Sequence, residues 1–347
     1  MKRTVQLHQN ECYWLLDEKL TEIVRAKIDA SVFSTYPEYA PLLAALAIYA
    51  KTPPESICVS AGSDAAISIL TELCIHKGMK VVLPVPTFYG YERILARHGL
   101  GVIPTYYTEK DGAFEFPLKE TLAELKEDTA LFLCHPNNPL GCTIPESDLE
   151  VLFESAKEKN ALVVLDEAYY EFGGTTYADR VLDQPMVVLR TLSKAFGLSG
   201  ARIGYTISSP SIIKSMQKLQ LPWPVSNPSV VAASALLENA ELVALRRQLV
   251  LSERDKFKDE LMKIPGIETF ASATNFVLAR TDNAREVADK LKEQGILVAT
   301  TDFMTGYEVA RELLASTLRI AVPSPEDRKR VVQAIREITL QMTESVV

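Results

Sequence analysis

The sequence has no run of about 18 or more apolar residues, so we expect no membrane span. Basic residues are in the minority, because 37 Lys and Arg face 45 Asp and Glu and give a formal net charge of −8. Proteins that hold nucleic-acid phosphates need basic patches, so this balance argues against a nucleic-acid partner. The first residues, Met1–Trp14, include two basic side chains but no apolar stretch after them. We therefore expect no signal peptide there.

Cysteine and histidine are also scarce. The five cysteines are odd in number, scattered, and contain no CxxC pair: Cys12, Cys58, Cys74, Cys134 and Cys142. This pattern predicts neither a disulfide framework nor a zinc site, and it favours a reducing cytoplasm. The four histidines are dispersed along the chain, so we expect no metal site: His8, His76, His98 and His135.

The composition is otherwise that of a globular protein, with 47% hydrophobic and 24% charged residues. A chain of 347 residues is longer than one typical domain. Its middle part alternates short apolar runs with longer amphipathic segments, which predicts an α/β fold with a mostly parallel, seven-stranded sheet covered by helices. The expected strands are Ile57–Ser60, Lys80–Pro84, Gly101–Tyr106, Thr129–Cys134, Ala161–Asp166, Met186–Thr191 and Arg202–Thr206.

The pattern of apolar and charged residues changes near Glu238, and a long charged helix is expected over about Ala240–Met262. Short elements follow it and predict a smaller α+β domain: Ile267–Phe270, Phe276–Arg280, Ala284–Gln294, Leu297–Thr300, Thr317–Ala321 and a helix from Pro325. We therefore expect an N-terminal arm and helix over residues 1–35 that joins the small domain. A large domain should cover residues 36–240 and a small C-terminal domain residues 241–347.

Polar segments follow several expected strands, where ligands bind in doubly wound sheets. Lys194 lies just after one strand, and its amine could form a Schiff base with an aldehyde. Asp166 ends a fully apolar strand and should be desolvated unless a cation meets it. Gly62-Ser63-Asp64 opens a helix, whose free amides bind anions well. Each feature has an ordinary alternative, namely a surface lysine, an N-capping aspartate and a capped helix without a ligand.

Taken together, these segments resemble the fold-type I transferases that depend on pyridoxal phosphate (PLP), and among them the histidinol-phosphate aminotransferase-like branch. The resemblance runs nearly end to end, from Asn10-Glu11 and Tyr36-Pro37 to Leu318-Arg319-Ile320. It includes the spacing of eight residues from Lys194 to Arg202. The resemblance implies an aminotransferase that moves an amino group from an amino acid to a 2-oxo acid through a Schiff base on Lys194.

The resemblance also implies roles for individual residues. Lys194, Asp166 and Tyr169 would be catalytic: Lys194 moves a proton, Asp166 keeps the ring nitrogen of PLP protonated, and Tyr169 reaches its phenolic oxygen. The other expected cofactor-binding residues are Gly62, Ser63, Asp64, Phe88, Asn138, Thr191, Ser193, Arg202 and Tyr36. The family's counterpart of Tyr36 reaches into the neighbouring subunit's site, which implies a homodimer. Arg319 and Asn10 would bind the substrate.

The sequence departs from this branch at three places. True histidinol-phosphate aminotransferases commonly carry an arginine where this chain has Ala299, and that arginine helps to bind the substrate phosphate. Leu140 replaces the usual threonine, and Cys12-Tyr13 replaces Asn-Pro in the arm. A substrate with a plain α-carboxylate is therefore at least as well supported. The alternatives are a true histidinol-phosphate aminotransferase, a decarboxylase of the same fold, and a PLP-binding regulatory module without turnover.

Overall fold

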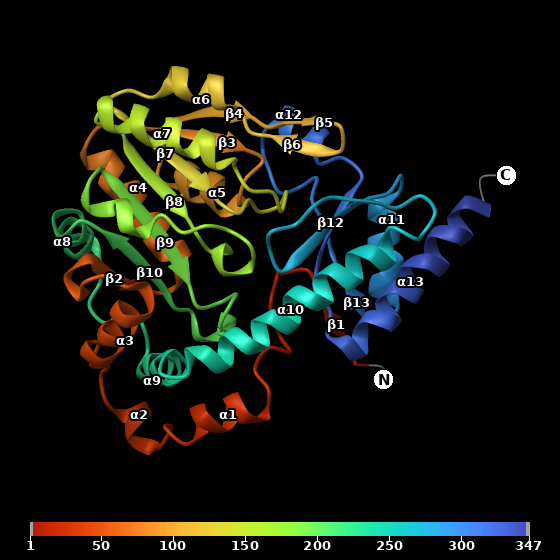
Figure 1. Cartoon of the computed structure of the whole chain (residues 1–347), viewed down its shortest axis with the longest axis horizontal. Coiled ribbons are helices and arrows are strands. Elements are labelled where there is room, and N and C mark those ends of the chain that lie inside the picture. Colours follow the sequence, from red (N-terminus) through yellow and green to blue (C-terminus); the bar gives the residue numbers. More distant parts are fainter. Residues whose placement is uncertain (1–2, 345–347) are drawn as a thin grey trace.

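The computed structural model describes residues 3–344 and confirms the predicted α/β fold (Figure 1). Its largest sheet has seven strands, and only β10 runs antiparallel to its neighbours. The spatial order is β2 (Ile57–Ser60), β10 (Gly204–Ser208), β9 (Met186–Thr191), β8 (Leu162–Asp166), β7 (Thr129–Cys134), β3 (Lys80–Val85) and β4 (Val102–Tyr106).

Helices cover both faces of this sheet, which explains why its central strands are apolar without alternation. Along β8, for example, Val163 and Leu165 pack into one core cluster and Leu162 and Val164 into another. The helices around the sheet are α3 (Ala40–Ala50), α4 (Gly62–His76), α5 (Tyr89–Arg97), α6 (Leu118–Glu124), α7 (Glu146–Glu158), α8 (Pro210–Leu219) and α9 (Asn227–Leu237).

Three predicted strands begin too early, those of β4 and β8 by one residue and that of β10 by two. We expected a strand from Arg202, whereas β10 begins at Gly204. Arg202 has a φ of 53°, in the left-handed region, and therefore cannot continue an extended strand. This turn directs the arginine side chain toward the start of α4, where it lies beside Asp64.

The C-terminal part forms a second sheet in the order β11 (Glu268–Thr269), β12 (Phe276–Arg280), β15 (Thr317–Ala321) and β14 (Ala299–Thr300). The long helix α10 (Ala240–Leu261) connects the two sheet regions (Figure 1). The expected strand Leu297–Thr300 is wrong as a single element, because β13 (Ile296–Leu297) pairs with the N-terminal arm and only β14 joins the sheet. The remaining elements of this part are α11 (Ala284–Glu293), α12 (Glu308–Leu313) and α13 (Pro325–Glu344).

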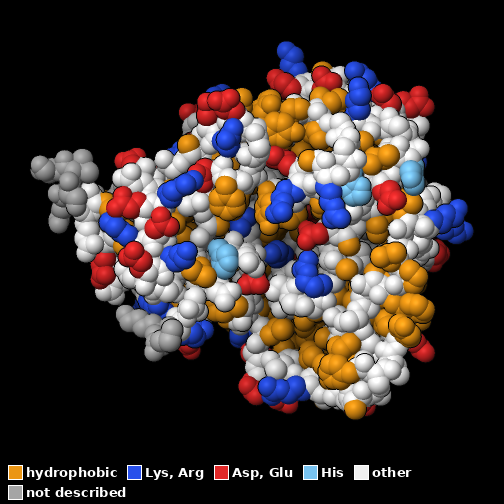
Figure 2. Space-filling model, turned by 180° about the vertical axis from the view of Figure 1, so that it is seen from behind, with side chains coloured by type: hydrophobic (Ala, Val, Ile, Leu, Met, Phe, Trp, Pro, Cys, Tyr) orange, Lys and Arg blue, Asp and Glu red, His pale blue; other side chains and the backbone are white. Residues whose placement is uncertain are grey.

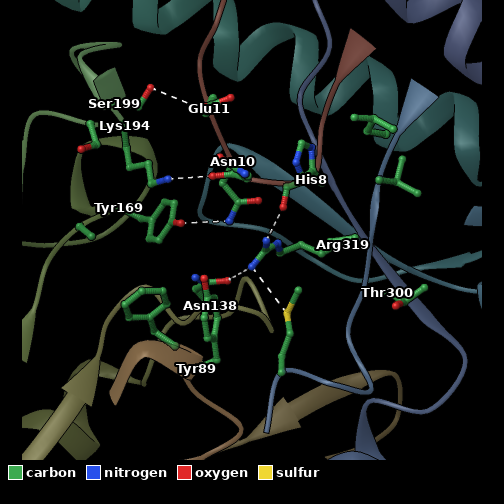
Figure 3. Close-up of a pocket in the computed structure, with 18 of the residues that line it drawn as sticks. His8, Asn10, Glu11, Tyr89, Asn138, Tyr169, Lys194, Ser199, Thr300 and Arg319 are labelled. Carbon is green, nitrogen blue, oxygen red and sulfur yellow. Dashed lines mark hydrogen bonds between the residues drawn. The ribbon is translucent and has the colours of Figure 1, made fainter. Parts of the chain in front are cut away.

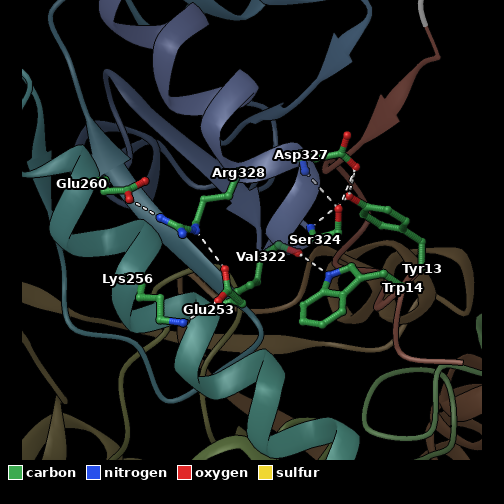
Figure 4. Close-up of polar contacts among 9 residues, drawn as sticks. All are labelled: Tyr13, Trp14, Glu253, Lys256, Glu260, Val322, Ser324, Asp327 and Arg328. Atoms are coloured by element: carbon green, nitrogen blue, oxygen red, sulfur yellow. Dashed lines mark hydrogen bonds and ion pairs between the residues drawn. The ribbon is translucent and has the colours of Figure 1, made fainter. Parts of the chain in front are cut away.

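The N-terminal arm is fastened to this second sheet region. Its strand β1 (Val5–Gln6) pairs in parallel with β13. Farther along, the Tyr13 hydroxyl donates to Asp327 at 2.7 Å and the Trp14 indole donates to the Val322 carbonyl at 3.1 Å (Figure 4). The arm segment between these anchors, residues 7–12, is thereby held between the two sheets. Helices α1 (Glu18–Arg25) and α2 (Ala30–Ser34) follow, while β5 (Thr108–Lys110) and β6 (Ala113–Glu115) form a separate hairpin.

The packing of α10 against α13 is reinforced by charge. Arg328 at the start of α13 bonds to Glu253 at 2.8 Å and also to Glu260, both on α10, while Lys256 pairs with Glu253 (Figure 4). Within residues 3–344, no single helix is long and apolar enough to cross a bilayer, although α9 and α10, bent by 83°, pass that test as a pair. The boundaries proposed at residues 36 and 241 stay predictions.

Candidate active site

A cavity of about 920 Å³ lies between the carboxyl ends of the large sheet's strands, the N-terminal arm and the second sheet. It is the kind of place where α/β proteins bind small molecules. All of the predicted site residues except Gly62 and Tyr36 line it: Asn10, Ser63, Asp64, Phe88, Asn138, Asp166, Tyr169, Thr191, Ser193, Lys194, Arg202 and Arg319. Residues up to 309 positions apart in the chain, Asn10 and Arg319, thus face one space (Figure 3).

Lys194 lies three residues beyond the end of β9, in the turn that leads to β10. Its Nζ donates a hydrogen bond to the Gln9 carbonyl in the arm at 3.0 Å and lies 5.9 Å from the centre of the Tyr169 ring (Figure 3). Burial and the nearby Arg319 lower the pKa of Lys194 to about 8. More of this amine is therefore uncharged near neutral pH than in an exposed lysine, which favours its action as a nucleophile or a base.

Asp166 is the last residue of β8 and is 3% exposed. Its Oδ1 accepts from the Ala168 amide at 2.9 Å, and its Oδ2 accepts from the Tyr91 hydroxyl at 2.8 Å. Burial raises the pKa of Asp166 to about 6, although both hydrogen bonds oppose that rise. No cationic side chain of residues 3–344 forms an ion pair with it. The cavity thus holds a desolvated acid that lacks a positive partner.

The start of α4 and the turn after β9 form a cradle for an anion. Among the described residues, no side chain caps α4, so its first amides are open to a ligand. Arg202 reaches this point with its Nη1 3.4 Å from Ser193 Oγ and its Nη2 3.3 Å from Asp64. Gly62 lies immediately behind, where a Cβ would come within 2.6 Å of Arg202 Nη2. Gly62 therefore serves the cradle by leaving room for the arginine, although it does not line the cavity.

Arg319 enters the cavity from β15 on the opposite side. It is 5% exposed, and its Nη1 and Nη2 donate to Asn138 Oδ1 and to the His8 carbonyl, both at 2.7 Å (Figure 3). No carboxylate within the described chain pairs with it, and its Nε has no hydrogen-bond partner there. Burial lowers the pKa of Arg319. A buried cation with neutral partners is a strong site for an anionic ligand.

Tyr169 and the arm close the space between these groups. The Asn10 side chain donates to the Tyr169 hydroxyl at 3.0 Å (Figure 3). Asn275 holds the backbone of the arm by donating to the Asn10 carbonyl at 2.9 Å. The Oδ1 of Asn10 is buried without a partner among the described residues. Asn10 therefore has a free acceptor next to Tyr169, as a residue that contacts a ligand can have.

Two groups of residues in or near the site were not predicted. His8, Gln9 and Glu11 reach the cavity only because the arm pairs with β13, and nothing local in the sequence indicates that pairing. Tyr91 reaches Asp166 from the first turn of α5, where a tyrosine also fits an ordinary core position. Tyr36 was predicted to reach the cofactor site of a partner subunit. In this chain its side chain is 74% exposed and stacks on Trp223, with 4.4 Å between the ring centroids.

Comparisons with known proteins agree over nearly the whole chain. The family model described as aminotransferase class I and II matches residues 2–335. The histidinol-phosphate aminotransferase of Chlorobaculum tepidum is 32% identical over 96% of this chain and 94% of its own length. That of Cronobacter sakazakii is 34% identical, over 96% of this chain and 91% of its own length.

Solved structures show the same fold. The histidinol-phosphate aminotransferase from Sinorhizobium meliloti, in complex with pyridoxal-5'-phosphate, superposes with a TM-score of 0.86 at 24% identity over 98% of this chain and 92% of that one. The L-threonine-O-3-phosphate decarboxylase from Porphyromonas gingivalis gives a TM-score of 0.80 at 21% identity over 96% and 99%. Proteins with different reactions share this fold, so the substrate has to be argued from the site.

Proposed function

The chain belongs to the class I and II aminotransferase family and is a PLP-dependent aminotransferase, and we propose that its substrates are amino acids and 2-oxo acids with a free α-carboxylate. The observation that carries this proposal is Arg319, a buried cation without a carboxylate partner within residues 3–344, which faces the same cavity as Lys194 and Asp166. A guanidinium binds a carboxylate through two parallel hydrogen bonds.

The residues around the cavity fit PLP. The desolvated Asp166 needs a positive partner, which a protonated pyridine nitrogen provides. The open amides of α4, with Ser193 and Arg202, suit the phosphate group. The Lys194 amine suits the aldehyde. When bound, PLP supplies an aldehyde that condenses with amines and an aromatic ring that takes up electrons.

In this arrangement each residue has a separate task. Arg319 holds the substrate carboxylate, which fixes the α-carbon relative to Lys194. The Nζ of Lys194, kept partly uncharged by burial and by Arg319, is the base that takes the proton from that carbon. Asp166 would hold a proton at the ring nitrogen of PLP, while Tyr169 and Asn138 would bind its phenolic oxygen. The arm limits access of water, because the Gln9 carbonyl and Asn10 lie directly over Lys194 and Tyr169.

The residue beside Arg319, Ala299, bears on whether the substrate group bound there is a carboxylate or a phosphate. Ala299 and Arg319 are cross-strand partners in β14 and β15, so their side chains lie on the same face of the sheet. The partner of Arg319 in β12 is Leu278, and the Met304 sulfur lies 3.7 Å from Nη1. A substrate group at Arg319 therefore meets one buried cation, the Asn138 amide and several apolar side chains. The other cations that line the cavity near Ala299, Arg285 and Lys292, are exposed, and Arg285 is paired with Asp302. This suits a monoanionic carboxylate better than a phosphate dianion, which binds best to several cationic groups.

A true histidinol-phosphate aminotransferase is the second candidate, because similar curated proteins carry that name. The two readings differ in a direct assay of amino transfer to 2-oxoglutarate with a panel of amino acids and histidinol phosphate. We expect glutamate from several amino acids and a lower kcat/KM for histidinol phosphate. A preference for histidinol phosphate would contradict the carboxylate proposal. Release of carbon dioxide would indicate a decarboxylase, and neither product would indicate a binding protein.

The same assay with Ala299→Arg makes the test specific. A second arginine next to Arg319 should raise kcat/KM for histidinol phosphate by about tenfold or more, the effect of one charged hydrogen bond. For amino acids with apolar side chains kcat/KM should fall, because the methyl surface is replaced by a charge. Val309→Arg, at an exposed position of α12 that does not line the cavity, is the control. Equal gains in both variants would contradict the role of Ala299.

We propose further that the protein is a homodimer in which Tyr36 completes the partner's phosphate site. Large apolar side chains are exposed around this residue, on α2, on α3 and between α8 and α9: Phe33, Ile48, Leu221 and Trp223. Figure 2 shows hydrophobic side chains gathered over the lower part of one face, where these N-terminal helices lie. An apolar patch of this kind is typical of a subunit interface.

The dimer can be tested by mixing two variants that each alter a different residue of the shared site. Sedimentation should give twice the 38.5 kDa mass of the chain. Tyr36→Phe should bind PLP more weakly because it lacks one hydroxyl donor. Mixing it with Lys194→Ala should create sites that have both wild-type residues, and thus restore tight PLP binding with attachment to Lys194, detected by borohydride reduction, at part of the sites. A monomer at micromolar concentration, or no restoration after mixing, would contradict the shared site.

The five cysteines are all free thiols, four of them buried. This supports the proposal that the enzyme works in a reducing cytoplasm. The net charge of −8 supports the proposal that it has no nucleic-acid partner.

A further inference from the structure

Tyr91 is a buried tyrosine that does not line the cavity but touches a residue that does. It lies in the first turn of α5, is fully buried, and donates its hydroxyl hydrogen to Asp166 Oδ2 at 2.8 Å. Its ring is held edge-on by Phe132 at 5.6 Å and Phe88 at 6.0 Å. Neither neighbour can replace the hydroxyl as a donor. The contact with Asp166 is therefore fixed by packing on two sides.

The surroundings of Asp166 make this hydrogen bond important. Several titratable groups lie near the carboxyl group, and most are neutral or negative: Asp64 from α4, Tyr91 from α5, Cys134 from β7, Glu167 and Tyr169 after β8, and Lys194 after β9. The negative charges of Asp64 and Glu167 both raise the pKa of Asp166. The hydrogen bonds from the Tyr91 hydroxyl and the Ala168 amide both favour the ionised form.

Tyr91 can act only as a donor in this pair. Burial and the Asp166 charge raise the pKa of its hydroxyl well above the usual value, so it keeps its proton throughout the working pH range. The hydrogen bond occupies one oxygen of Asp166 and the Ala168 amide the other. Together they fix the plane of the carboxyl group, which determines where its remaining lone pairs point.

We propose that Tyr91 is a positioning residue that keeps Asp166 ionised and oriented toward the ring nitrogen of PLP. The inference rests on the assignment of Asp166 to that nitrogen in the proposed function. It adds that Tyr91, a residue of α5 that does not line the cavity, sets the pH range in which the enzyme holds its cofactor.

The experiment compares the wild-type holoenzyme with Tyr91→Phe, which keeps the ring and removes the hydroxyl. The dissociation constant of PLP is measured across pH 5–9 without any amino acid. Loss of a hydrogen bond to a charged group should move the acid limb of cofactor binding upward by about one pH unit. The titrating groups of PLP itself are the same in both proteins, so the difference between the two curves reports on Asp166.

Activity gives a second readout. The kcat of amino transfer should fall several-fold below pH 7, and less above pH 8, while KM for the amino donor changes little. Tyr177→Phe is the matched control, because it alters a buried ring that does not line the cavity. A loss of PLP affinity that is equal at every pH would show a merely structural role and overturn the proposal, as would an unchanged curve. Because the binding curves need no substrate, they stand even if no transfer is detected.

Discussion

Replacing Lys194 with alanine should lower the rate of amino transfer by about 10³-fold or more, within the range by which a positioned proton-transfer group accelerates a reaction. The structure gives this amine two properties that an exposed lysine lacks. Its pKa is lowered to about 8, and it is directed by the Gln9 carbonyl toward the space between Tyr169 and Arg319. The variant should still bind PLP, because Asp166 and the cradle around Arg202 remain.

Two measurements check this expectation. Glutamate formation gives the rate, and borohydride reduction followed by peptide mass spectrometry shows whether the cofactor is attached to residue 194. Lys218→Ala on the exposed side of α8 is the control and should behave like the wild type. If Lys194→Ala kept more than a tenth of the activity, or if the reduced cofactor were found on another lysine, the proposed mechanism would be wrong.

The large sheet could be predicted from sequence because each of its strands is a local apolar run followed by a polar segment. Asp166 and Lys194 follow such runs, and parallel strands bring their carboxyl ends to one edge whatever the loops do. Arg202 was predicted from its spacing to Lys194, but its backbone conformation and the direction of its side chain needed the structure. Its left-handed backbone conformation shortens β10 and explains why Gly62 leaves room for it.

The part of the site formed by the N-terminal arm and β14 depends on long-range contacts that no local sequence pattern predicts. β1 and β13 have two residues each and pair across almost the whole chain, so neither has a recognisable pattern. That pairing brings Gln9 to Lys194 and splits the expected strand before Ala299. The role proposed for Tyr91 likewise follows from one hydrogen bond between residues 75 positions apart.

Replacing Arg319 with glutamine should lower kcat/KM for amino acids by about 10²-fold or more, because the substrate loses two charged hydrogen bonds. Glutamine can keep an amide near Asn138 but has neither the charge nor the two-pronged geometry of a guanidinium. The cation is also one of the causes that lower the pKa of Lys194. Its removal should therefore raise that pKa and, because Lys194 acts in its uncharged form, move the acid limb of activity to higher pH.

A substrate without a carboxylate separates binding from general damage to the site. A simple primary amine gains nothing from Arg319, so its slow reaction should proceed in Arg319→Gln about as well as in the wild type. Arg280→Gln is the matched control, because Arg280 lies in the same sheet but is paired with Glu109 at 2.5 Å. An equal loss for amines and amino acids would contradict carboxylate binding by Arg319. If Arg319 binds the substrate carboxylate, the loss of activity should be confined to amino acids.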